Sequence, residues 1–362
     1  MQILRNHEPL RIGFLPLSDC APLVYAWEAG LFEKYELNVE LQREIRWGDL
    51  RDKVIAGDLD AAQAPAPLPF LANVGVDSDH CSCVSGMVLN LQGSAITVSR
   101  RLWEEGVSDA AGLRSRIYDN WGKKTYTFAF SHTFSAQYYL LETWLKRGGV
   151  VPDRGIRLVV MPPSQLFPTL KLGYIDGYCV GEPWTSMAVQ AEIGVCVATS
   201  ADLAPLHPEK VLMVRQGFAI GRAPEHERII AALLEACAFC DRAENWPLIA
   251  EMICQRRYVD APVECFQGGV EPQSPGGARR QVVPGSDIFH RFEANVPTHD
   301  KAAWIMDLLY DLLKKHSLEW RRARPAPILK NIFRRDSFDR GQALLSHPAQ
   351  HEADAPLAGR PS

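Results

Sequence analysis

The sequence lacks any run of about 20 consecutive apolar residues, which is the length that a membrane-spanning helix requires. It also lacks an excess of charge of one sign, because 39 Lys and Arg residues stand against 43 Asp and Glu residues, for a net charge of −4. A chain so close to neutral has no general affinity for nucleic acid or anionic lipid. We therefore expect neither direct binding of nucleic acid nor insertion into a membrane.

Motifs of hydrolytic and phosphate-binding enzymes are missing as well. The sequence has no G-x-S-x-G turn, no glycine-rich phosphate loop and no pair of carboxylates arranged for acid–base hydrolysis. We expect a protein that binds a ligand without catalysis, and that uses no cofactor and no metal ion.

The N-terminus, "MQILRNHEPLRIGF", does not have the form of a signal peptide, because Arg5, His7 and Glu8 interrupt the apolar segment. The nine cysteines are odd in number and have no framework spacing, which indicates reduced thiols. Both features predict a cytoplasmic protein. A leader encoded upstream of Met1 would instead make the protein periplasmic.

The order of predicted elements indicates two similar domains. The first half alternates strands such as "LRIGFLP" with helices such as "APLVYAWEAGLFEKY", a pattern typical of a parallel, doubly wound sheet. A second set of the same kind begins near residue 100, with "TYTFAF" as its first strand. From "VLMVRQGFAIG" onward the chain becomes helical, and the apolar residues of 305–312 have the spacing of a core-facing stripe.

These elements predict an α/β protein with two lobes and a C-terminal addition. We expect lobe 1 to contain residues 1–98 and 214–300, and lobe 2 to contain residues 99–213. Residues 301–345 are predicted to form a helical segment that packs on the lobes. The polar residues 346–362 have too little apolar content to fold and are predicted to be a disordered tail.

Ligands of open α/β sheets lie beyond the carboxyl ends of the strands, so a site is expected in the cleft between the two domains. The candidate residues at predicted strand ends are Trp47, Gln92, His132, Gly181 and Lys210. His132 and Gly181 are predicted to begin helices, whose free N–H groups favour an anion. Lys210 adds one cation, Gln92 an amide donor and Trp47 a flat wall. This combination suits a small, planar oxyanion with a single charge.

Each of these residues also has an ordinary structural explanation. A histidine at the start of a helix is usually a cap, a lysine is usually solvated and a tryptophan usually belongs to the core. Asp19, which follows the first strand, is expected to cap the helix after it. The prediction of an anion site therefore depends on the whole set of residues.

Several blocks of the sequence resemble, in order, those of the nitrate-binding and bicarbonate-binding proteins of bacterial ABC importers. These blocks include "GFLPLSDCAPLVYAWEAGLFEKYELNVEL", "LNLQGSAITVS", "GYCVGEPW" and "LHPEKVLMV". The resemblance implies a C-shaped, two-domain fold of the periplasmic-binding-protein type II, with the ligand in the interdomain cleft. It also implies that the anion contacts the five candidate residues named above.

The same resemblance implies a choice of ligand. The resemblance implies that the bicarbonate-binding branch has an acidic residue at the position of Lys210, so that a bound calcium ion can bridge to its ligand. A lone ammonium at this position therefore predicts nitrate or nitrite, because the two residues differ by about two charge units. A site made only of donors also suits nitrate, which carries no proton near neutral pH.

Three functions are consistent with these features. The absence of a leader makes the chain similar to the cytoplasmic nitrate/nitrite sensor branch, which implies control of an RNA-binding antitermination regulator. The alternative is the binding subunit of a nitrate ABC importer, with an ABC permease as its partner. A third, weaker resemblance is to enzymes of pyrimidine-precursor synthesis, because "HCSC" (80–83) contains soft metal ligands, although no second ligand cluster follows it.

Overall fold

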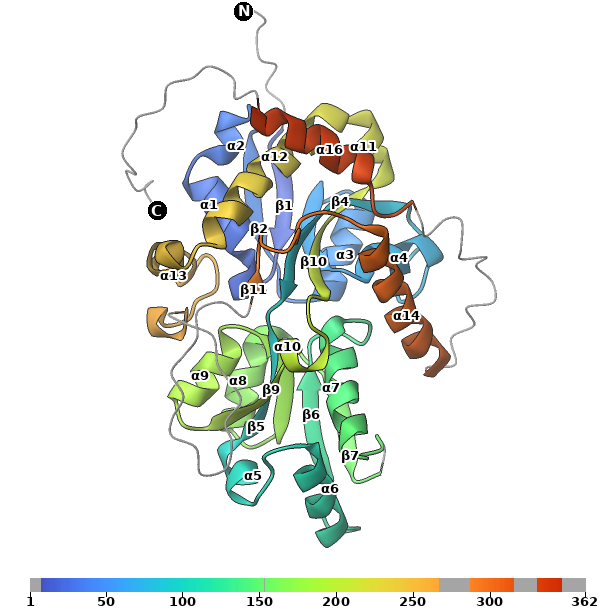
Figure 1. The fold of residues 1–362 in the computed structure, drawn as a ribbon, viewed down its shortest axis with the longest axis vertical. Helices are drawn as coiled ribbons and strands as arrows, with labels where there is room; N and C mark the ends of the chain where they lie inside the picture. Colours follow the sequence, from blue (N-terminus) through green and yellow to red (C-terminus); the bar gives the residue numbers. More distant parts are fainter. Residues whose placement is uncertain (1–7, 153, 267–286, 316–330, 347–362) are drawn as a thin grey trace, which may run out of the picture.

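Two β-sheets form the two lobes of the protein (Figure 1). The computed structural model describes residues 8–152, 154–266, 287–315 and 331–346. In this part of the chain, lobe 1 is built on a sheet with the strand order β11-β4-β10-β3-β1-β2, and lobe 2 on a sheet with the order β7-β6-β8-β5-β9. The strands of lobe 1 are β1 (Leu10–Phe14), β2 (Val39–Arg43), β3 (Ala61–Pro65), β4 (Cys83–Gln92), β10 (Pro208–Arg215) and β11 (Asp287–Ile288). Those of lobe 2 are β5 (Ser94–Ser99), β6 (Tyr126–Phe130), β7 (Ile156–Val160), β8 (Gly177–Gly181) and β9 (Gly194–Thr199).

Helices cover both sheets (Figure 1). Lobe 1 carries α1 (Ala21–Glu28), α2 (Leu31–Lys34), α3 (Trp47–Ala56), α4 (Leu68–Val74), α11 (Gln216–Gly221), α12 (Ala223–Cys240), α13 (Trp246–Ile253) and α16 (Arg335–Ala343). Lobe 2 carries α5 (Arg100–Glu104), α6 (Ala110–Asp119), α7 (Ala136–Arg147), α8 (Pro163–Lys171), α9 (Trp184–Gln190) and α10 (Ser200–Leu203). Within the described ranges, no helix is both long and apolar enough to cross a membrane.

The predicted alternation of strands and helices is present in both lobes. β1 pairs in parallel with β2 and β3, and β6 pairs in parallel with β7 and β8. The strands that connect the lobes are antiparallel to their neighbours, since β10 lies between β3 and β4, and β5 lies between β8 and β9. The fold class predicted from the sequence, a two-lobed α/β protein, is therefore confirmed.

The chain crosses between the lobes at Gly93 and again in residues 204–207. β4 ends at Gln92 in the sheet of lobe 1, and β5 begins at Ser94 in the sheet of lobe 2. Both crossings thus precede the predicted boundaries at 98/99 and 213/214. The sequence placed the boundaries too late because the apolar runs on either side of a crossing have the same period. Gly93 has φ +99°, and a Cβ there would lie 1.9 Å from Oδ1 of Asp287, so only glycine fits this turn.

The first predicted helix is divided in two. Gly30 has φ +70°, in the left-handed region, and separates α1 from α2. Gly57 ends α3 in the same region, with φ +91°.

The C-terminal helices contact both lobes. The predicted apolar stripe of α14 (His299–Lys315) is buried at Ile305, Leu308, Leu309 and Leu312. Trp304 of α14 meets Tyr139 of α7 edge to face, with their ring centroids 5.6 Å apart, while α16 packs on α12 in lobe 1. The predicted tail beyond residue 346 lies outside the described residues.

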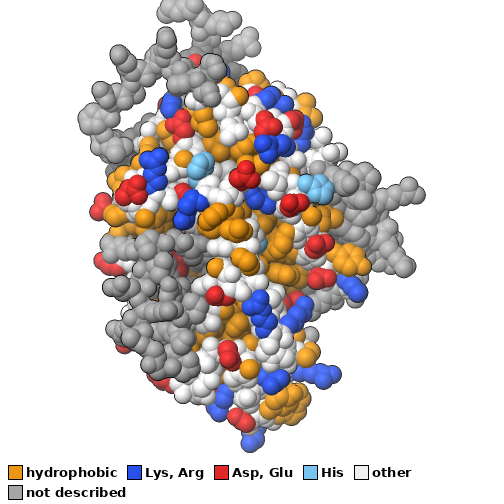
Figure 2. Space-filling model, in the orientation of Figure 1, with side chains coloured by type: hydrophobic (Ala, Val, Ile, Leu, Met, Phe, Trp, Pro, Cys, Tyr) orange, Lys and Arg blue, Asp and Glu red, His pale blue; other side chains and the backbone are white. Residues whose placement is uncertain are grey.

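Charged side chains of both signs are interspersed over the face of the molecule shown in Figure 2. This distribution agrees with the near-neutral net charge of −4. On this face neither lobe presents a surface of a single charge.

Candidate functional site

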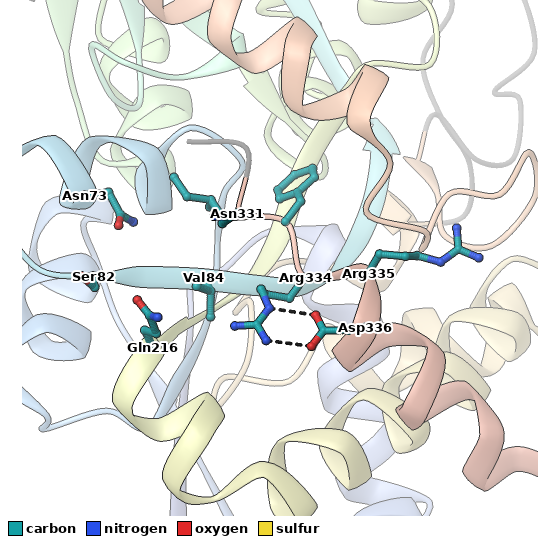
Figure 3. Close-up of a pocket in the computed structure, with 10 residues that line it drawn as sticks. Asn73, Ser82, Val84, Gln216, Asn331, Arg334, Arg335 and Asp336 are labelled. Atoms are coloured by element: carbon teal, nitrogen blue, oxygen red, sulfur yellow. Dashed lines mark hydrogen bonds and ion pairs between the residues drawn. The ribbon is translucent and has the colours of Figure 1, made fainter. Parts of the chain in front are cut away.

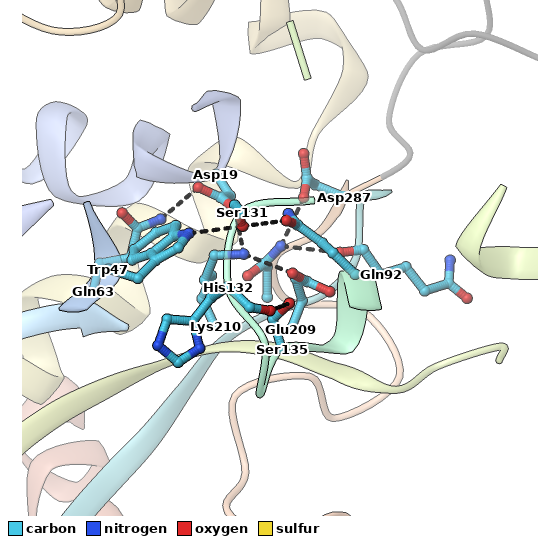
Figure 4. Close-up of polar contacts among 12 residues, drawn as sticks. Asp19, Trp47, Gln63, Gln92, Ser131, His132, Ser135, Glu209, Lys210 and Asp287 are labelled. Atoms are coloured by element: carbon cyan, nitrogen blue, oxygen red, sulfur yellow. Dashed lines mark hydrogen bonds and ion pairs between the residues drawn. The ribbon is translucent and has the colours of Figure 1, made fainter. Parts of the chain in front are cut away.

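Lys210 of β10 lies at the boundary between the lobes, held between two carboxylates (Figure 4). Its Nζ is 3.0 Å from Oδ2 of Asp19 and 2.7 Å from Oε1 of Glu209, and the residue is only 1% exposed. Burial lowers the pKa of Lys210, but the two carboxylates more than offset this effect and hold the pKa above its ordinary value. The lysine is therefore charged, and it is not the lone ammonium that the sequence suggested.

The sequence suggested that Asp19 caps the following helix, but the structure shows that it does not. It lies within a short 3-10 turn, Ser18–Cys20, and α1 begins after Cys20 without a side-chain cap. The turn directs the Asp19 carboxylate inward, where Oδ1 accepts a hydrogen bond of 2.6 Å from Nε2 of Gln63. Burial raises the pKa of Asp19, and the charge of Lys210 offsets only part of that rise.

Glu209 connects Lys210 to a buried histidine. Its Oε2 lies 2.9 Å from Nε2 of His207, and Nδ1 of the same ring lies 2.8 Å from the carbonyl oxygen of Ala204. Burial alone would raise the pKa of Glu209, but Lys210 and His207 together lower it to about 2. The Glu209 carboxylate is therefore ionised at neutral pH.

Asp287 adds a third buried carboxyl group at the start of β11. Its Oδ2 accepts a hydrogen bond of 3.0 Å from Oγ of Ser18, and its Oδ1 accepts one of 2.7 Å from Nδ2 of Asn90. Burial, followed by the negative charge of Asp19, raises the pKa of Asp287 to about 8. This carboxyl group is therefore mostly protonated at pH 7.

Trp47, the first residue of α3, joins the lysine to lobe 2. Its ring lies beneath Lys210, with Nζ 5.3 Å from the ring centroid, which is a cation–π distance. Its Nε1 donates a hydrogen bond of 3.1 Å to Oγ of Ser131, in the loop after β6. The structure thus brings two predicted site residues, Trp47 and Lys210, into direct contact.

His132 also lies at the boundary, but it does not begin a helix. α7 starts at Ala136, because the hydroxyl of Ser135 caps it by accepting from the N–H of Tyr138. Nδ1 of His132 accepts a hydrogen bond from the N–H of Phe134 at 3.2 Å, and Nε2 lies 3.3 Å from Oδ2 of Asp77 in lobe 1. Both ring nitrogens therefore have partners in this conformation.

The His132–Asp77 pair links the lobes electrostatically. The hydrogen bond from His132 lowers the pKa of Asp77 against the effect of burial, and Arg51 lowers it further, to about 2. Nη1 of Arg51 lies 2.8 Å from Oδ2 of Asp77. Asp77 is thus a carboxylate at the rim of the boundary, with one cationic partner in its own lobe and one histidine in the other.

Gly181 is the last residue of β8 and pairs with Ser94 of β5, so it too is not a helix N-terminus. The following helix, α9, begins at Trp184. The side-chain oxygen of Gln92 accepts a hydrogen bond of 2.7 Å from the N–H of Leu206, so this amide lies at the place where the chain crosses between lobes.

Backbone contacts show that the two lobes are closed on each other. The N–H of Ser18 donates to the carbonyl oxygen of Glu182 at 2.7 Å. Nε1 of Trp184 donates to the carbonyl oxygen of Pro16 at 3.2 Å. These contacts join the loop after β1 to residues 182–184, which follow β8, and they lie beside a lysine that is only 1% exposed.

The sequence analysis missed four polar residues of this site: Gln63, Asn90, Glu209 and Asp287. Glu209 had a signal, since it is the acidic neighbour of Lys210 in "HPEK". Asp287 had none, because it lies 197 positions from Asn90 and only tertiary structure brings the two together.

The described residues contain no group of three or more His, Cys, Asp or Glu side chains positioned to hold a metal ion. This finding includes the "HCSC" segment, where Cys83 is buried and Cys81 is half-buried. The segment therefore does not provide the iron site that the third sequence hypothesis required.

A polar hollow lies on lobe 1, where residues 331–336 cross it (Figure 3). It has a volume of about 640 Å³ and is lined in part by Asn73, Gln216 and Arg334. Arg334 is paired with Asp336, with Nη2 2.7 Å from Oδ2. This arginine is offset by one carboxylate and Lys210 by two, so charge pairing does not distinguish the two places as anion sites.

Two open α/β sheets joined by two crossings, with a buried polar cluster between them, define a two-lobed fold of the periplasmic-binding-protein type II. The chain belongs to the NMT1-like family, whose sequence model matches residues 5–254.

Individual relatives are proteins of nitrate and bicarbonate transport. The chain is 36% identical over 305 residues to a bicarbonate transport ATP-binding protein of Synechococcus elongatus, covering 83% of this chain and 44% of that protein. It is 31% identical over 318 residues to the nitrate/nitrite binding protein NrtA of Nostoc sp., covering 84% of this chain and 71% of the relative. The chain thus spans less than half the length of the ATP-binding relative.

A solved structure supports the fold. The periplasmic nitrate-binding protein NrtA of Synechocystis superimposes with a TM-score of 0.83 at 23% identity, covering 95% of this chain and 90% of that one. The resemblance stated from the sequence is therefore confirmed at the level of family and fold. The names of NrtA and of the bicarbonate-binding protein CmpA agree with the expectation of a binding protein and not an enzyme.

Proposed function

We propose that this protein binds a small oxyanion of the nitrate, nitrite and bicarbonate class between its two lobes. The observation that carries the proposal is the buried ammonium of Lys210, which lies over the ring of Trp47 while that ring donates to Ser131 of the other lobe. A ligand at this place would contact both lobes and favour their closure. Two relatives are named for binding nitrate/nitrite and bicarbonate, which supports the class of ligand.

Nitrate or nitrite is the first candidate within this class. The five residues that the family resemblance assigns to the nitrate-binding branch are all present: Trp47, Gln92, His132, Gly181 and Lys210. We propose that they contact the anion once the lobes open and close around it. His132 would then exchange Asp77 for the ligand, since both of its ring nitrogens are engaged in the closed conformation.

Hydrogencarbonate is the second candidate, favoured by the acceptor groups around Lys210. Asp19, Glu209 and Asp287 are carboxyl groups, and the buried Oε1 of Gln63 and Oδ1 of Asn90 accept no hydrogen bond within the described structure. A ligand with its own O–H group would donate to such acceptors, whereas nitrate would not.

Calorimetric titration with sodium nitrate, nitrite, hydrogencarbonate and chloride tests this function. We expect binding of at least one of the first three in the absence of calcium, and its loss in Lys210→Gln. Lys124→Gln is the matched control, because Lys124 also pairs with an aspartate, at 2.9 Å from Asp176, and lies over the ring of Tyr126, but in lobe 2 away from the site. Unchanged affinity in Lys210→Gln would contradict the assignment.

The cellular role has two candidates. The relatives named for import and transport favour the binding subunit of an ABC importer, with an ABC permease as partner. A cytoplasmic sensor that controls an RNA-binding antitermination regulator is favoured by nine free thiols, all within the described residues, which suit a reducing compartment. The relative named as an ATP-binding protein also favours the cytoplasmic side, where ATP is present.

Fractionation of the host cell distinguishes these roles. Recovery of the protein with the permease in a membrane or periplasmic fraction would support the importer subunit. Recovery in the cytoplasm, with anion-dependent co-purification of an RNA-binding regulator, would support the sensor.

A further inference from the structure

The buried groups around Lys210 divide into pairs whose charges cancel. Both ring nitrogens of His207 face acceptors, the carbonyl oxygen of Ala204 at 2.8 Å and Oε2 of Glu209 at 2.9 Å. Each of these contacts requires a proton between its two atoms. The His207–Glu209 pair therefore carries one positive and one negative charge, or none, and its net charge is zero in either case.

The remaining groups of the cluster are also neutral as a set. Lys210 is offset by Asp19, whose Oδ2 lies 3.0 Å from Nζ. Asp287 receives hydrogen bonds from Ser18 and Asn90, which are uncharged, and it adds no charge when protonated. At neutral pH the cluster thus has no positive charge to spare.

An incoming anion would leave this buried place with one uncompensated negative charge, which is costly in a desolvated site. The anion binding proposed above, on which this inference rests, therefore needs a compensating step. We propose that the anion is bound together with one proton, which Asp19 takes up as Lys210 moves from the Asp19 carboxylate to the ligand. The proton comes from solvent and adds to Oδ1 of Asp19, the oxygen that faces the Gln63 amide, so a carboxylate becomes a carboxylic acid and no other covalent bond changes.

The surroundings of Asp19 accommodate both of its protonation states. In the ionised state Nε2 of Gln63 donates to Oδ1 at 2.6 Å. After protonation the amide can rotate by half a turn, so that its Oε1, which has no donor in the described structure, accepts from the new O–H group. An amide offers a donor and an acceptor at nearly the same position, whereas a lysine or arginine would hold only the ionised form.

The titratable groups that face Asp19 come from three elements. Lys210 and Glu209 face it from β10, Asp287 faces it from β11, and the thiol of Cys20 is its neighbour in the 3-10 turn. Burial raises the pKa of Asp19, and Lys210 is the main group that opposes this rise. Moving the ammonium to a ligand removes that opposition and raises the pKa of Asp19 further, which favours its protonation.

Calorimetry with sodium nitrate in buffers of different ionisation enthalpy measures the coupling directly, because nitrate carries no proton of its own. At pH 7 we expect uptake of about one proton per anion bound, and an affinity that falls about tenfold for each unit by which the pH is raised. Asp19→Asn should bind nitrate without proton uptake and with little dependence on pH.

Asp176→Asn is the matched control, because Asp176 is also buried and paired with a lysine, but lies in lobe 2 away from the site. It should take up the same proton as the wild type. Nitrate binding by the wild type with no proton uptake would overturn the coupling and leave the proposed function standing. Absence of binding of nitrate, nitrite and hydrogencarbonate alike would overturn both. The measurement on the wild type decides the matter even where a variant does not fold.

Discussion

Removal of the Lys210 ammonium tests how strongly the site depends on charge pairing. Lys210→Gln keeps a polar side chain of similar length but leaves Asp19 and Glu209 buried without their shared cation. The two carboxylates lie 3.0 and 2.7 Å from Nζ in the wild type. The substitution therefore removes two close ion pairs at once.

The size of the effect follows from these distances. At an effective dielectric constant of about 20, each pair contributes roughly 6 kcal/mol of Coulomb energy. The cost of desolvating the ammonium offsets much of this gain, and loss of one partner of a buried ion pair typically destabilises a protein by about 3–5 kcal/mol. We expect Lys210→Gln to lower the free energy of unfolding by that amount at pH 7.

Urea unfolding at pH 5 and pH 8 is the assay. Without Lys210 the folded-state pKa of Asp19 rises further, so the variant should be less destabilised at pH 5, where the folded protein can protonate this carboxyl group. Lys210→Gln combined with Asp19→Asn should recover part of the loss. A loss below about 1 kcal/mol at both pH values would refute the ion-pair account.

Three further substitutions test other parts of the site. Trp47→Phe keeps an aromatic ring but removes the hydrogen bond to lobe 2. It should weaken nitrate binding by about 1 kcal/mol, or five- to tenfold, in a calorimetric titration. Unchanged affinity would show that this hydrogen bond does not stabilise the closed form. Asp77→Asn removes the charge that faces His132. Because Asp77 is half exposed, the substitution should change the free energy of closure by only about 0.2–1 kcal/mol. X-ray scattering should show a small rise in the radius of gyration of the unliganded protein, and an unchanged radius would contradict this role. Asp287 has a folded-state pKa of about 8 against an ordinary value of 3.8, so between these pH values the folded state binds more protons than the unfolded state. The free energy of unfolding therefore falls as the pH rises through this range, by up to about 1.4 kcal/mol per pH unit. Asp287→Asn should remove this slope in urea unfolding curves, and a slope equal to that of the wild type would show that Asp287 is ionised in the fold.

The regular elements were predictable because their signals are local. The alternation of strands and helices follows from hydrophobic period, and the stripe of Ile305, Leu308, Leu309 and Leu312 is buried as its spacing predicted. The lobe boundaries were displaced because β4 and β5 are both apolar strands, and only pairing with different sheets separates them at Gly93.

The contacts of the site were not predictable from spacing. Asp19 and Lys210 are far apart in the sequence, and a carboxylate after a strand is as consistent with a helix cap as with an ion pair. The starts of α7 and α9 were placed too early, because Ser135 and not His132 caps α7, and β8 extends to Gly181. Residue types could thus predict that polar groups gather between the lobes, but not the charges that neutralise Lys210.

A crystal structure of the protein grown with nitrate would test the central claim most directly. We expect the anion between the lobes, against the ring of Trp47, with Nζ of Lys210 turned toward it and away from Asp19. Nitrate found only elsewhere on the protein, with Lys210 still held between Asp19 and Glu209, would contradict the account.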